Sequence, residues 1–287
     1  MRNFGVEIEL NSFDNRDFSK NPLQTGEFPE GFFDVVDSIS SIGFDVEPKS
    51  WHYTHNNTNW IVKTDSSCGI EICSPVFDNT DSVIRLLNHL KKEKFKANNS
   101  CSFHIHFDFL NNSDQQVASV LSWWVKVEHL IFDCLSKNRK CNSYCKSIGF
   151  SDIFNHDYVP SKDIIYSLGK SKYYSANAFH LVRNSRRTLE FRIFNSKEFI
   201  DSPIDFSYWV LFLNKFIEAS ISKGIPSNLC WVDLEELLAL LNLKKEKLFW
   251  FLSKMSRQIN KKSLFRSKSL DDLKKIFVEK SNLMKDK

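Results

Sequence analysis

The chain has 287 residues, of which 42% are hydrophobic and 26 are Phe, and its formal net charge is +4. This composition excludes an intrinsically disordered chain and indicates one large globular domain with an appendage. The most apolar stretch, 208–217, is about half as long as a membrane span, and the N-terminus shows no apolar signal segment. We therefore expect a cytoplasmic protein without a membrane segment.

The cysteine pattern indicates reduced thiols. There are seven cysteines, an odd number and too few for a disulfide scaffold in a chain of this size. Spacings such as Cys68-x4-Cys73 and Cys141-x3-Cys145 do not match the CxxC pattern of zinc knuckles. We therefore expect reduced, metal-free thiols in a reducing compartment rather than thiols that bind a structural zinc ion.

Positive charge is concentrated near the C-terminus. Residues 244–287 contain 14 Lys or Arg and 5 Asp or Glu, whereas the rest of the chain is mildly acidic. A basic tail of this kind can contact nucleic acid or another polyanion, and it can equally be the solvated face of a helix. The sequence leaves both interpretations open.

The first part of the chain mixes strands and helices without a regular strand–helix–strand alternation. Its patterns predict, in order, a strand at 4–10, a helix near 29–42 that Gly43 ends, a hairpin around the Asn- and Thr-rich turn between Trp51 and Trp60 that leads into 61–63, and a strand at 69–75 that Pro75 ends.

The second part begins with a helix whose cap is Asn79 or Thr80. Ser113 and Gln116 have the spacing of a capping box and predict the start of a long helix. The remaining expectations are a strand at 101–109, a loop-rich stretch at 137–160, strands at 176–183 and 187–194 around the turn 184–186, a helix at 203–224, and short amphipathic helices beyond Pro226.

These elements indicate the α+β class, with a mostly antiparallel sheet flanked by helices. We expect the catalytic domain to cover 1–225 and a basic helical extension to cover 226–287.

Several of the expected strands carry polar residues on one face and apolar residues on the other. Strand side chains alternate with a period of two, so Glu7 and Glu9 share a face opposite Val6 and Ile8. The same rule places the following residues on polar faces: Glu71 on one strand, His104, His106 and Asp108 on another, and Glu190 with Arg192 on a third.

Each polar face taken alone has an ordinary explanation. Glutamates are common on exposed strands, paired histidines can be hydrogen-bonded, and Glu190 with Arg192 can form a simple ion pair. Adjacent buried carboxylates, however, repel one another unless a cation such as Mg²⁺ or Mn²⁺ neutralises them. Several such faces in one chain, with Lys63 and Asp65 nearby, therefore favour a metal–nucleotide site.

A glycine-rich phosphate loop is absent from the sequence. Gly169-Lys170-Ser171 has the end of such a loop, but Ile164 occupies the position that requires the first glycine. With only eight glycines, the chain would have to bind phosphates through cations and side chains.

Five ordered segments of the chain form a recognisable series: FGVEIEL at 4–10, WIVKTDSS at 60–67, GIEICSP at 69–75, CSFHIHFD at 101–108 and TLEFRIFN at 188–195. They resemble the successive motifs of the amidoligases, which are carboxylate–amine ligases related to glutamine synthetase and glutamate–cysteine ligase. Arg139 with Tyr144-Cys145, Tyr173 with Asn177, and Trp209 fit the intervening features, whereas Ser102 and Asn195-Ser196 depart from the usual residues.

The resemblance implies a glutamine-synthetase-like catalytic domain whose curved sheet binds ATP through Mg²⁺ or Mn²⁺. ATP would phosphorylate a substrate carboxylate, and an amine would attack the acyl phosphate to form an amide. Carried over by position, the resemblance implies metal ligands at Glu7, Glu9, Glu71, His104 and Glu190, further catalytic residues at His106 and Arg192, and nucleotide or substrate contacts at Lys63, Asp65, Arg139, Asn177 and Arg192.

Two other functions remain open from the residues alone. A metal-dependent hydrolase or phosphoesterase could use the same acids and histidines, and a nucleic-acid-binding module could act through the tail at 244–287. For a ligase, the loop at 137–160 could close as a lid that keeps water from the acyl phosphate. The carboxylate and amine substrates, whether small molecules, peptides or modified macromolecules, stay undefined.

Overall fold

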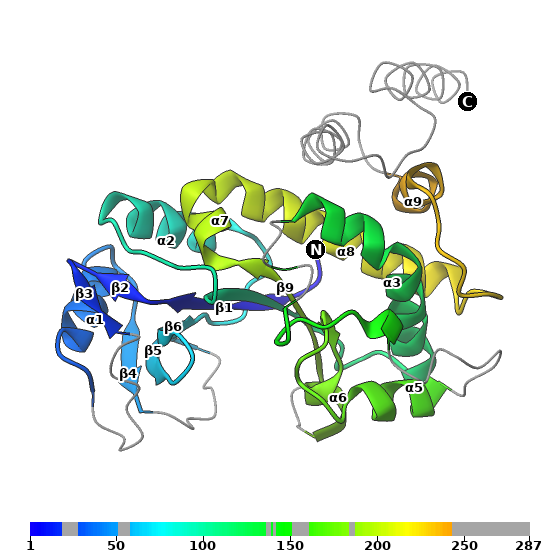
Figure 1. The fold of residues 1–287 in the computed structure, drawn as a ribbon, viewed down its shortest axis with the longest axis horizontal. Coiled ribbons are helices and arrows are strands. Elements are labelled where there is room, and N and C mark those ends of the chain that lie inside the picture. The colour runs from blue at the N-terminus through cyan, green and yellow to red at the C-terminus, as the bar shows by residue number, and fades with distance from the viewer. Residues whose placement is uncertain are drawn as a thin grey trace, which may run out of the picture. The chain divides into compact units, whose positions relative to one another are not determined.

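The computed structural model describes residues 1–18, 28–50, 58–135, 139, 142–150, 161–183 and 187–242. The chain divides into two compact units, Met1–Trp231 and Val232–Lys287. In the second unit the structure describes one helix, α9 (Leu234–Leu241), so most of the basic tail lies outside the described residues. The first unit contains the sheet and the candidate site (Figure 1).

The first unit is organised around a seven-stranded sheet in the order β4-β5-β6-β1-β7-β9-β8. All neighbouring strands are antiparallel except β4 and β5, which confirms the predicted mostly antiparallel sheet in a protein of mixed helices and strands. The strands are β1 (Phe4–Leu10), β4 (Val46–Lys49), β5 (Trp60–Asp65), β6 (Gly69–Cys73), β7 (Ser102–Asp108), β8 (Ala176–Asn177) and β9 (Thr188–Asn195), with β2 (Ser12–Phe13) and β3 (Arg16–Asp17) forming a separate pair.

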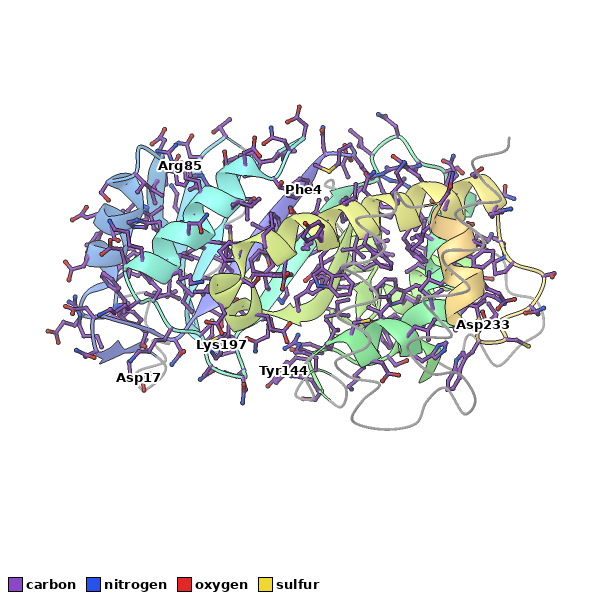
Figure 2. The ribbon with its side chains drawn as sticks, turned by 90° about the horizontal axis from the view of Figure 1, so that it is seen from above. Phe4, Asp17, Arg85, Tyr144, Lys197 and Asp233 are labelled. Atoms are coloured by element: carbon purple, nitrogen blue, oxygen red, sulfur yellow. The ribbon has the colours of Figure 1, made fainter. Side chains whose placement is uncertain are left out.

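The helices of the first unit cover the sheet. Figure 1 shows α2, α7 and α8 along one side of β1, and the view from above in Figure 2 shows α2 and α8 side by side across the strands. The helical elements are α1 (Phe32–Ser40), α2 (Asp81–Lys92), α3 (Asp114–Cys134), the 3-10 turn η2 (Ile148–Phe150), α5 (Ser161–Leu168), α6 (Phe179–Arg183), α7 (Ser196–Asp201) and α8 (Pro203–Lys223).

Alternation along the central strands separates the core from the polar face. In β1, Val6 and Ile8 are buried, and the carboxylates of Glu7 and Glu9 belong to the opposite face. On the core side, the Phe103 ring of β7 lies 4.7 Å from Phe199 in α7. Edge-to-face aromatic contacts of this kind bind the helices to the sheet and hold the strands in register.

Local signals place the long helices where the sequence predicts them. The capping box of α3 is complete, because the Ser113 side chain accepts from the Gln116 amide and the Gln116 side chain accepts from the Ser113 amide. Helix α8 begins at Pro203, as expected of a residue without an amide hydrogen. The predicted helix near 29–42 is shorter, with its first turn at Phe32.

One sequence prediction differs from the structure, and another falls largely outside the described residues. Residues 176–183 do not form one long strand: β8 ends at Asn177, whose Oδ1 accepts a hydrogen bond from the Phe179 amide and so starts helix α6. The hairpin expected between Trp51 and Trp60 includes residues 51–57, which lie outside the described residues. The strand that precedes them, β4, runs parallel to β5.

Two further observations concern the cysteines and the helices of the described residues. The six described cysteines form no disulfide, and five of them are buried. No helix in the described part of the chain combines the length and the apolar character that are needed to cross a membrane.

Candidate active site

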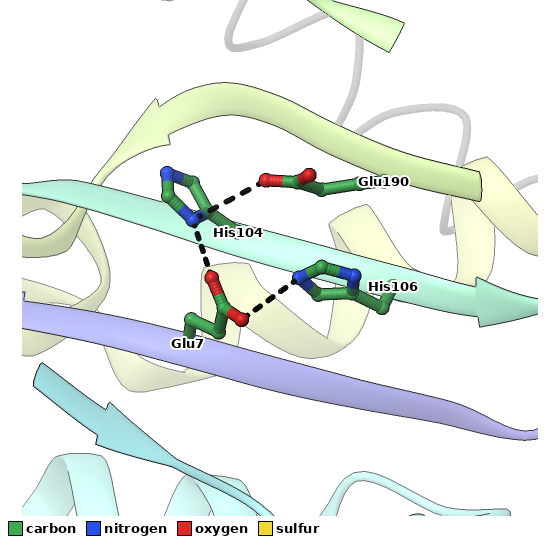
Figure 3. Close-up of side chains that lie close together, drawn as sticks. All are labelled: Glu7, His104, His106 and Glu190. Atoms are coloured by element: carbon green, nitrogen blue, oxygen red, sulfur yellow. Dashed lines mark hydrogen bonds and ion pairs between the residues drawn. The ribbon is translucent and has the colours of Figure 1, made fainter. Parts of the chain in front are cut away.

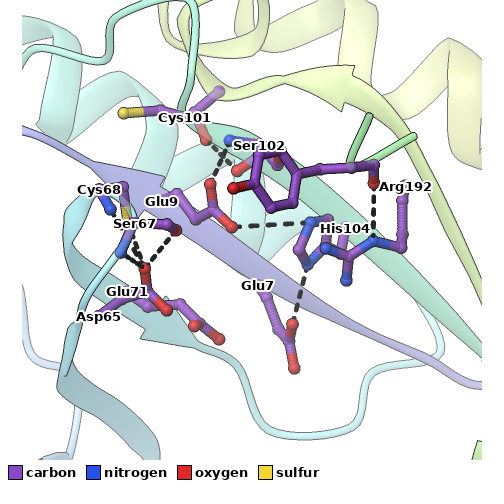
Figure 4. A network of polar contacts seen from close by, with 12 residues as sticks. Glu7, Glu9, Asp65, Ser67, Cys68, Glu71, Cys101, Ser102, His104 and Arg192 are labelled. Atoms are coloured by element: carbon purple, nitrogen blue, oxygen red, sulfur yellow. Dashed lines mark hydrogen bonds and ion pairs between the residues drawn. The ribbon is translucent and has the colours of Figure 1, made fainter. Parts of the chain in front are cut away.

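Strand pairing brings the predicted site residues together on one face of the sheet. In register, Glu9 of β1 lies opposite Glu71 of β6, and Glu7 lies opposite His104 of β7. On the other side of β7, His106 lies opposite Glu190 of β9. Residues separated by more than one hundred positions in the sequence therefore lie on one face of the sheet, and Figure 4 shows part of their network of polar contacts.

Four of these residues form a compact group that we call the histidine cluster: Glu7, His104, His106 and Glu190. One possible ligand atom from each of the four residues lies within 4.8 Å of the other three. The Nδ1 atom of His104 lies 2.9 Å from Glu7 Oε2 and 3.4 Å from Glu190 Oε1, and Nε2 of His106 lies 3.5 Å from Glu7 Oε1 (Figure 3). Glu7 thus connects the two histidines.

Glu190 is the most deeply buried carboxylate of this cluster, with a side chain that is 1% exposed. Arg192 Nη1 and Asn177 Nδ2 each lie 2.6 Å from one of its oxygens, and His180 Nε2 lies 3.8 Å from Oε2. Burial opposes ionisation of Glu190, but Arg192 and the two histidines of the cluster outweigh it and lower its pKa to about 2. The carboxylate is therefore ionised at neutral pH.

The other members of the histidine cluster also have shifted pKa values. Burial would raise the pKa of Glu7, but His106, His104 and Lys63 outweigh it and hold this pKa well below its usual range. Burial, followed by the charge of Arg192, lowers the pKa of His104 to about 4, so this imidazole is neutral at neutral pH. For His106, burial is outweighed by the carboxylates of Glu7 and Glu190, which raise its pKa.

The second half of the polar face contains Glu9, Asp65, Glu71 and Lys63, which we call the acidic half. Lys63 Nζ lies 3.0 Å from Glu71 Oε1. The Ser102 amide donates to Glu9 Oε2 at 2.5 Å. Figure 4 shows Glu9, Asp65 and Glu71 facing one another across β1, β6 and the end of β5.

Cationic compensation is weak in the acidic half. Burial, with repulsion from Glu71 and Asp65, raises the pKa of Glu9 to about 8 despite the hydrogen bond from Ser102. Burial likewise raises the pKa of Glu71 to about 7, although Lys63 opposes this shift. These carboxylates would ionise at lower pH if a further cation lay beside them.

Asp65 also stabilises the turn between β5 and β6. Its Oδ1 accepts the backbone amides of Ser67 at 2.7 Å and Cys68 at 3.1 Å, which closes the turn between β5 and β6. The turn ends at Gly69, whose φ of +105° and close approach to the Phe18 backbone leave no room for a Cβ.

The donor atoms of this face fit a divalent cation. Besides the histidine cluster, Glu7, Glu71 and Cys73 form a second group that could hold an ion. Nε2 of both His104 and His106 is buried and makes no hydrogen bond to the described residues. Buried nitrogens without a hydrogen bond are rare in folded proteins, and carboxylates with imidazoles suit Mn²⁺ or, through the oxygens, Mg²⁺.

The structure groups most of the predicted metal ligands. Glu7, His104 and Glu190 lie together in the histidine cluster, and Glu71 joins Glu7 in the second group. Glu9 belongs to neither group, but its Oε1 lies 3.7 Å from His104 Nε2, between the two halves of the face. Metal binding by each of these residues stays a prediction.

Arg139 occupies a different environment from the one that its predicted nucleotide contact suggests. It is fully buried, and its guanidinium donates to the main-chain oxygens of Arg192 and Ile193 and to Ser102 Oγ. These bonds hold the ends of β7 and β9 beside the site. A direct nucleotide contact of Arg139 stays a prediction, and positioning of Arg192 is the role that its bonds support.

Sequence reasoning did not select two residues of the site. Cys73 shares the polar face with Glu71, and its Sγ lies 3.2 Å from Glu71 Oε1, so the period-two rule could have found it. His180 lies in α6, which the sequence predicted to be a strand, and its proximity to Glu190 depends on that helix.

Comparison with known proteins identifies the family. The family model described as "Putative amidoligase enzyme" matches residues 1–210, which contain all of the predicted site residues. The chain belongs to the amidoligase family. No curated protein sequence matches this amidoligase.

Among solved structures, the amidoligase chain is similar to a bifunctional glutathione synthetase from Pasteurella multocida, with 12% sequence identity and a TM-score of 0.44. The alignment covers 90% of this chain and 47% of that protein, so the chain spans about half the length of its structural neighbour. A similarity at this level carries no argument about the reaction.

Proposed function

We propose that the protein is an ATP-dependent carboxylate–amine ligase that acts through an acyl phosphate, on a glutamine-synthetase-like catalytic domain. The charge balance of the buried polar face carries this proposal. Five carboxylates, those of Glu7, Glu9, Asp65, Glu71 and Glu190, face two permanently charged cations among the described residues, Lys63 and Arg192. Such a face favours divalent cations and the phosphates that they accompany.

The reaction that we propose has two steps. The γ-phosphoryl group of ATP passes to a substrate carboxylate, giving ADP and an acyl phosphate. The nitrogen of the amine then bonds to the acyl carbon, the bond from that carbon to the phosphate oxygen breaks, and inorganic phosphate and a proton are released. Phosphoryl transfer of this kind depends on positioning and charge neutralisation rather than on a protein nucleophile.

Different residues of the polar face would bind the metal and stabilise the transferred phosphoryl group. Glu7, Glu71, Glu190 and the two histidines would hold Mg²⁺ or Mn²⁺, which when bound neutralises phosphate charge and orients it. Arg192 points its guanidinium into this surface from β9 and would stabilise charge on the transferring phosphoryl group. Glu190 fixes Arg192 in that position at 2.6 Å.

A metal-dependent hydrolase is the second candidate, and the two buried imidazole nitrogens favour it, because histidines are frequent ligands of hydrolytic metal ions. The two candidates differ in their need for ATP. The polyanion contact through 244–287 and the lid at 137–160 fall wholly or largely outside the described residues and stay predictions, as does cytoplasmic localisation.

The proposal is tested by supplying the purified full chain with a fractionated cell extract, MgCl₂ and ATP. The readouts are ADP by enzymatic assay and new condensation products by mass spectrometry. We expect condensation with ADP release, and a loss of about 100-fold or more in Glu71→Gln and Arg192→Ala, since single groups that stabilise a transition state contribute on this scale.

Asp114→Asn provides the matched control, because Asp114 pairs with Arg187 at the start of α3 and is not part of the polar face. This variant should retain activity. Bond cleavage without ATP consumption would support the hydrolase instead. Condensation that persists in both Glu71→Gln and Arg192→Ala would overturn the assignment of the face.

A further inference from the structure

An exposed aromatic pair lies beside Arg192, outside the histidine cluster and the acidic half. Tyr144 is 54% exposed, and its ring meets the ring of Tyr173 edge-to-face, with the ring centroids 5.4 Å apart. The main-chain oxygen of Tyr144 accepts a hydrogen bond from Arg192 Nε at 3.4 Å. The pair is therefore joined to the arginine that we propose to contact the transferring phosphoryl group.

Hydrogen bonds hold the backbone on which Tyr144 is carried. The Lys146 amide donates to the main-chain oxygen of Tyr173 at 2.7 Å, which joins the two chain segments next to the rings. Farther along, the Ile148 amide donates at 3.2 Å to the buried carboxylate of Glu128 in α3. Because this backbone is already fixed, a ligand that stacks on the ring has little chain entropy to overcome.

The surroundings of the pair suit a ligand that is both aromatic and anionic. Lys172 Nζ lies 5.5 Å from the centre of the Tyr173 ring, and Lys146 is exposed two residues beyond Tyr144. Exposed ammonium groups attract phosphates, and an exposed tyrosine ring can stack on a nucleobase. A nucleoside polyphosphate contains both groups.

Exposure alone does not distinguish Tyr144 from other tyrosines of the chain. Tyr166 of α5 is 60% exposed, and Lys170 Nζ lies 5.0 Å from the centre of its ring. The distinguishing feature of Tyr144 is the bond from its main chain to Arg192. A nucleotide whose terminal phosphate lies at Arg192 must extend past the neighbours of this arginine, and Tyr144 is one of them.

We propose that Tyr144, supported by Tyr173, stacks on the base of the nucleotide whose terminal phosphate lies at Arg192. This inference rests on the proposed ATP-dependent function and adds the residue that contacts the base. Stacking uses the face of the base and not its hydrogen-bonding edge. Tyr144 would therefore contribute affinity for the base as a flat ring, separately from the affinity that the metal and Arg192 contribute for the phosphates.

Isothermal titration calorimetry on the full chain with MgCl₂ tests the inference. The probes are adenylyl imidodiphosphate, a non-hydrolysable ATP analogue, and tripolyphosphate, which has the phosphates but no base. We expect Tyr144→Ala to weaken binding of the analogue about tenfold, because one stacked base contributes on this scale, and to leave tripolyphosphate binding within about twofold. Tyr144→Phe keeps the ring, so it should bind both probes as the wild type does.

Tyr166→Ala is the matched control, because it removes an exposed tyrosine ring that belongs to α5 and not to the segment bonded to Arg192. It should leave both affinities unchanged. An unchanged affinity for the analogue in Tyr144→Ala, an equal loss for both probes, or an equal loss in Tyr166→Ala would overturn the inference alone. Wild-type protein that binds neither probe would overturn the proposed function as well.

Discussion

The histidine cluster and the acidic half occupy the same face of the same sheet, yet their carboxylates have opposite electrostatic states. Glu190 has a pKa of about 2, whereas Glu9 has a pKa of about 8. Burial raises the pKa of both groups, so it does not explain the difference. Arg192 and the histidines face Glu190, whereas Glu9 meets other acids and the amide of Ser102.

The chain itself therefore supplies the positive charge that balances the acids of the histidine cluster, but not all of the charge that would balance the acidic half. The histidine cluster already contains the positive charge that its acids need. In the acidic half, Lys63 compensates Glu71 only in part. A bound divalent cation would therefore change the acidic half more than the histidine cluster.

We expect the largest loss of stability when a charged partner is removed from the histidine cluster. Glu190→Ala leaves the largely buried guanidinium of Arg192 without its carboxylate partner at 2.6 Å. Loss of one partner of a buried pair typically costs about 3–5 kcal/mol of stability. Chemical denaturation of the metal-free protein at pH 5, where Glu190 is ionised, measures this change.

Glu9→Gln is the matched comparison, because Glu9 is largely protonated at neutral pH and Gln keeps an acceptor for the Ser102 amide. At pH 5, where Glu9 is still protonated in the folded state, the free energy of unfolding of this variant should change by less than about 1 kcal/mol. Equal losses in Glu190→Ala and Glu9→Gln would remove the distinction between the two halves.

The next largest effect is expected in the pH dependence of stability, which should differ between the acidic half and the histidine cluster. The folded pKa of Glu9, about 8, lies above the ordinary value of 4.5, so its contribution to stability falls as pH rises from 4.5 to 8. The folded pKa of Glu190, about 2, lies below 4.5, so its contribution is present above pH 4.5 and is lost as pH falls toward 2. Each group changes stability by at most about 1.4 kcal/mol per pH unit.

Thermal unfolding of the metal-free wild type and of Glu9→Gln across this range tests the prediction. Near pH 5 the wild type and the variant should have about equal free energies of unfolding. Between pH 6 and pH 8 the variant should lose less stability than the wild type. Parallel profiles for the two proteins would show that Glu9 does not titrate in this window.

The smallest effect is expected at the edge of the acidic half. Asp65→Asn keeps the Oδ1 acceptor for the amides of Ser67 and Cys68, so the turn should retain its stability within about 1 kcal/mol. Thermal unfolding measures this change, and calorimetry with Mn²⁺ measures metal affinity. If Asp65→Asn weakens Mn²⁺ binding as much as Glu71→Gln does, Asp65 is a metal ligand and the acidic half extends to the turn.

The sequence predicted the faces of the strands but not their pairing. Period-two alternation was sufficient to place Glu7 with Glu9 and His104 with His106, because it depends only on backbone geometry. Strand order depends on contacts between distant segments. Nothing local in the sequence says that Glu190 of β9 faces His106 of β7.

Hydrogen bonds to the main chain explain two local environments that the sequence pattern did not show. His180 lies near Glu190 because the Asn177 side chain caps the Phe179 amide and turns the chain into α6, a capping bond that competed with the strand pattern. Arg139 is a basic residue like Arg192, but main-chain oxygens of β9 occupy its guanidinium. Charge alone could not distinguish these two environments.

The central claim is that this face holds a divalent cation, and a titration with Mn²⁺ followed by electron paramagnetic resonance tests it most directly. Glu7 belongs to both candidate ligand groups, so Glu7→Gln should weaken Mn²⁺ binding at pH 8.5 by at least about tenfold, whereas Asp114→Asn should not change it. Wild-type protein that binds no Mn²⁺, or Mn²⁺ affinity that Glu7→Gln leaves unchanged, would contradict the account.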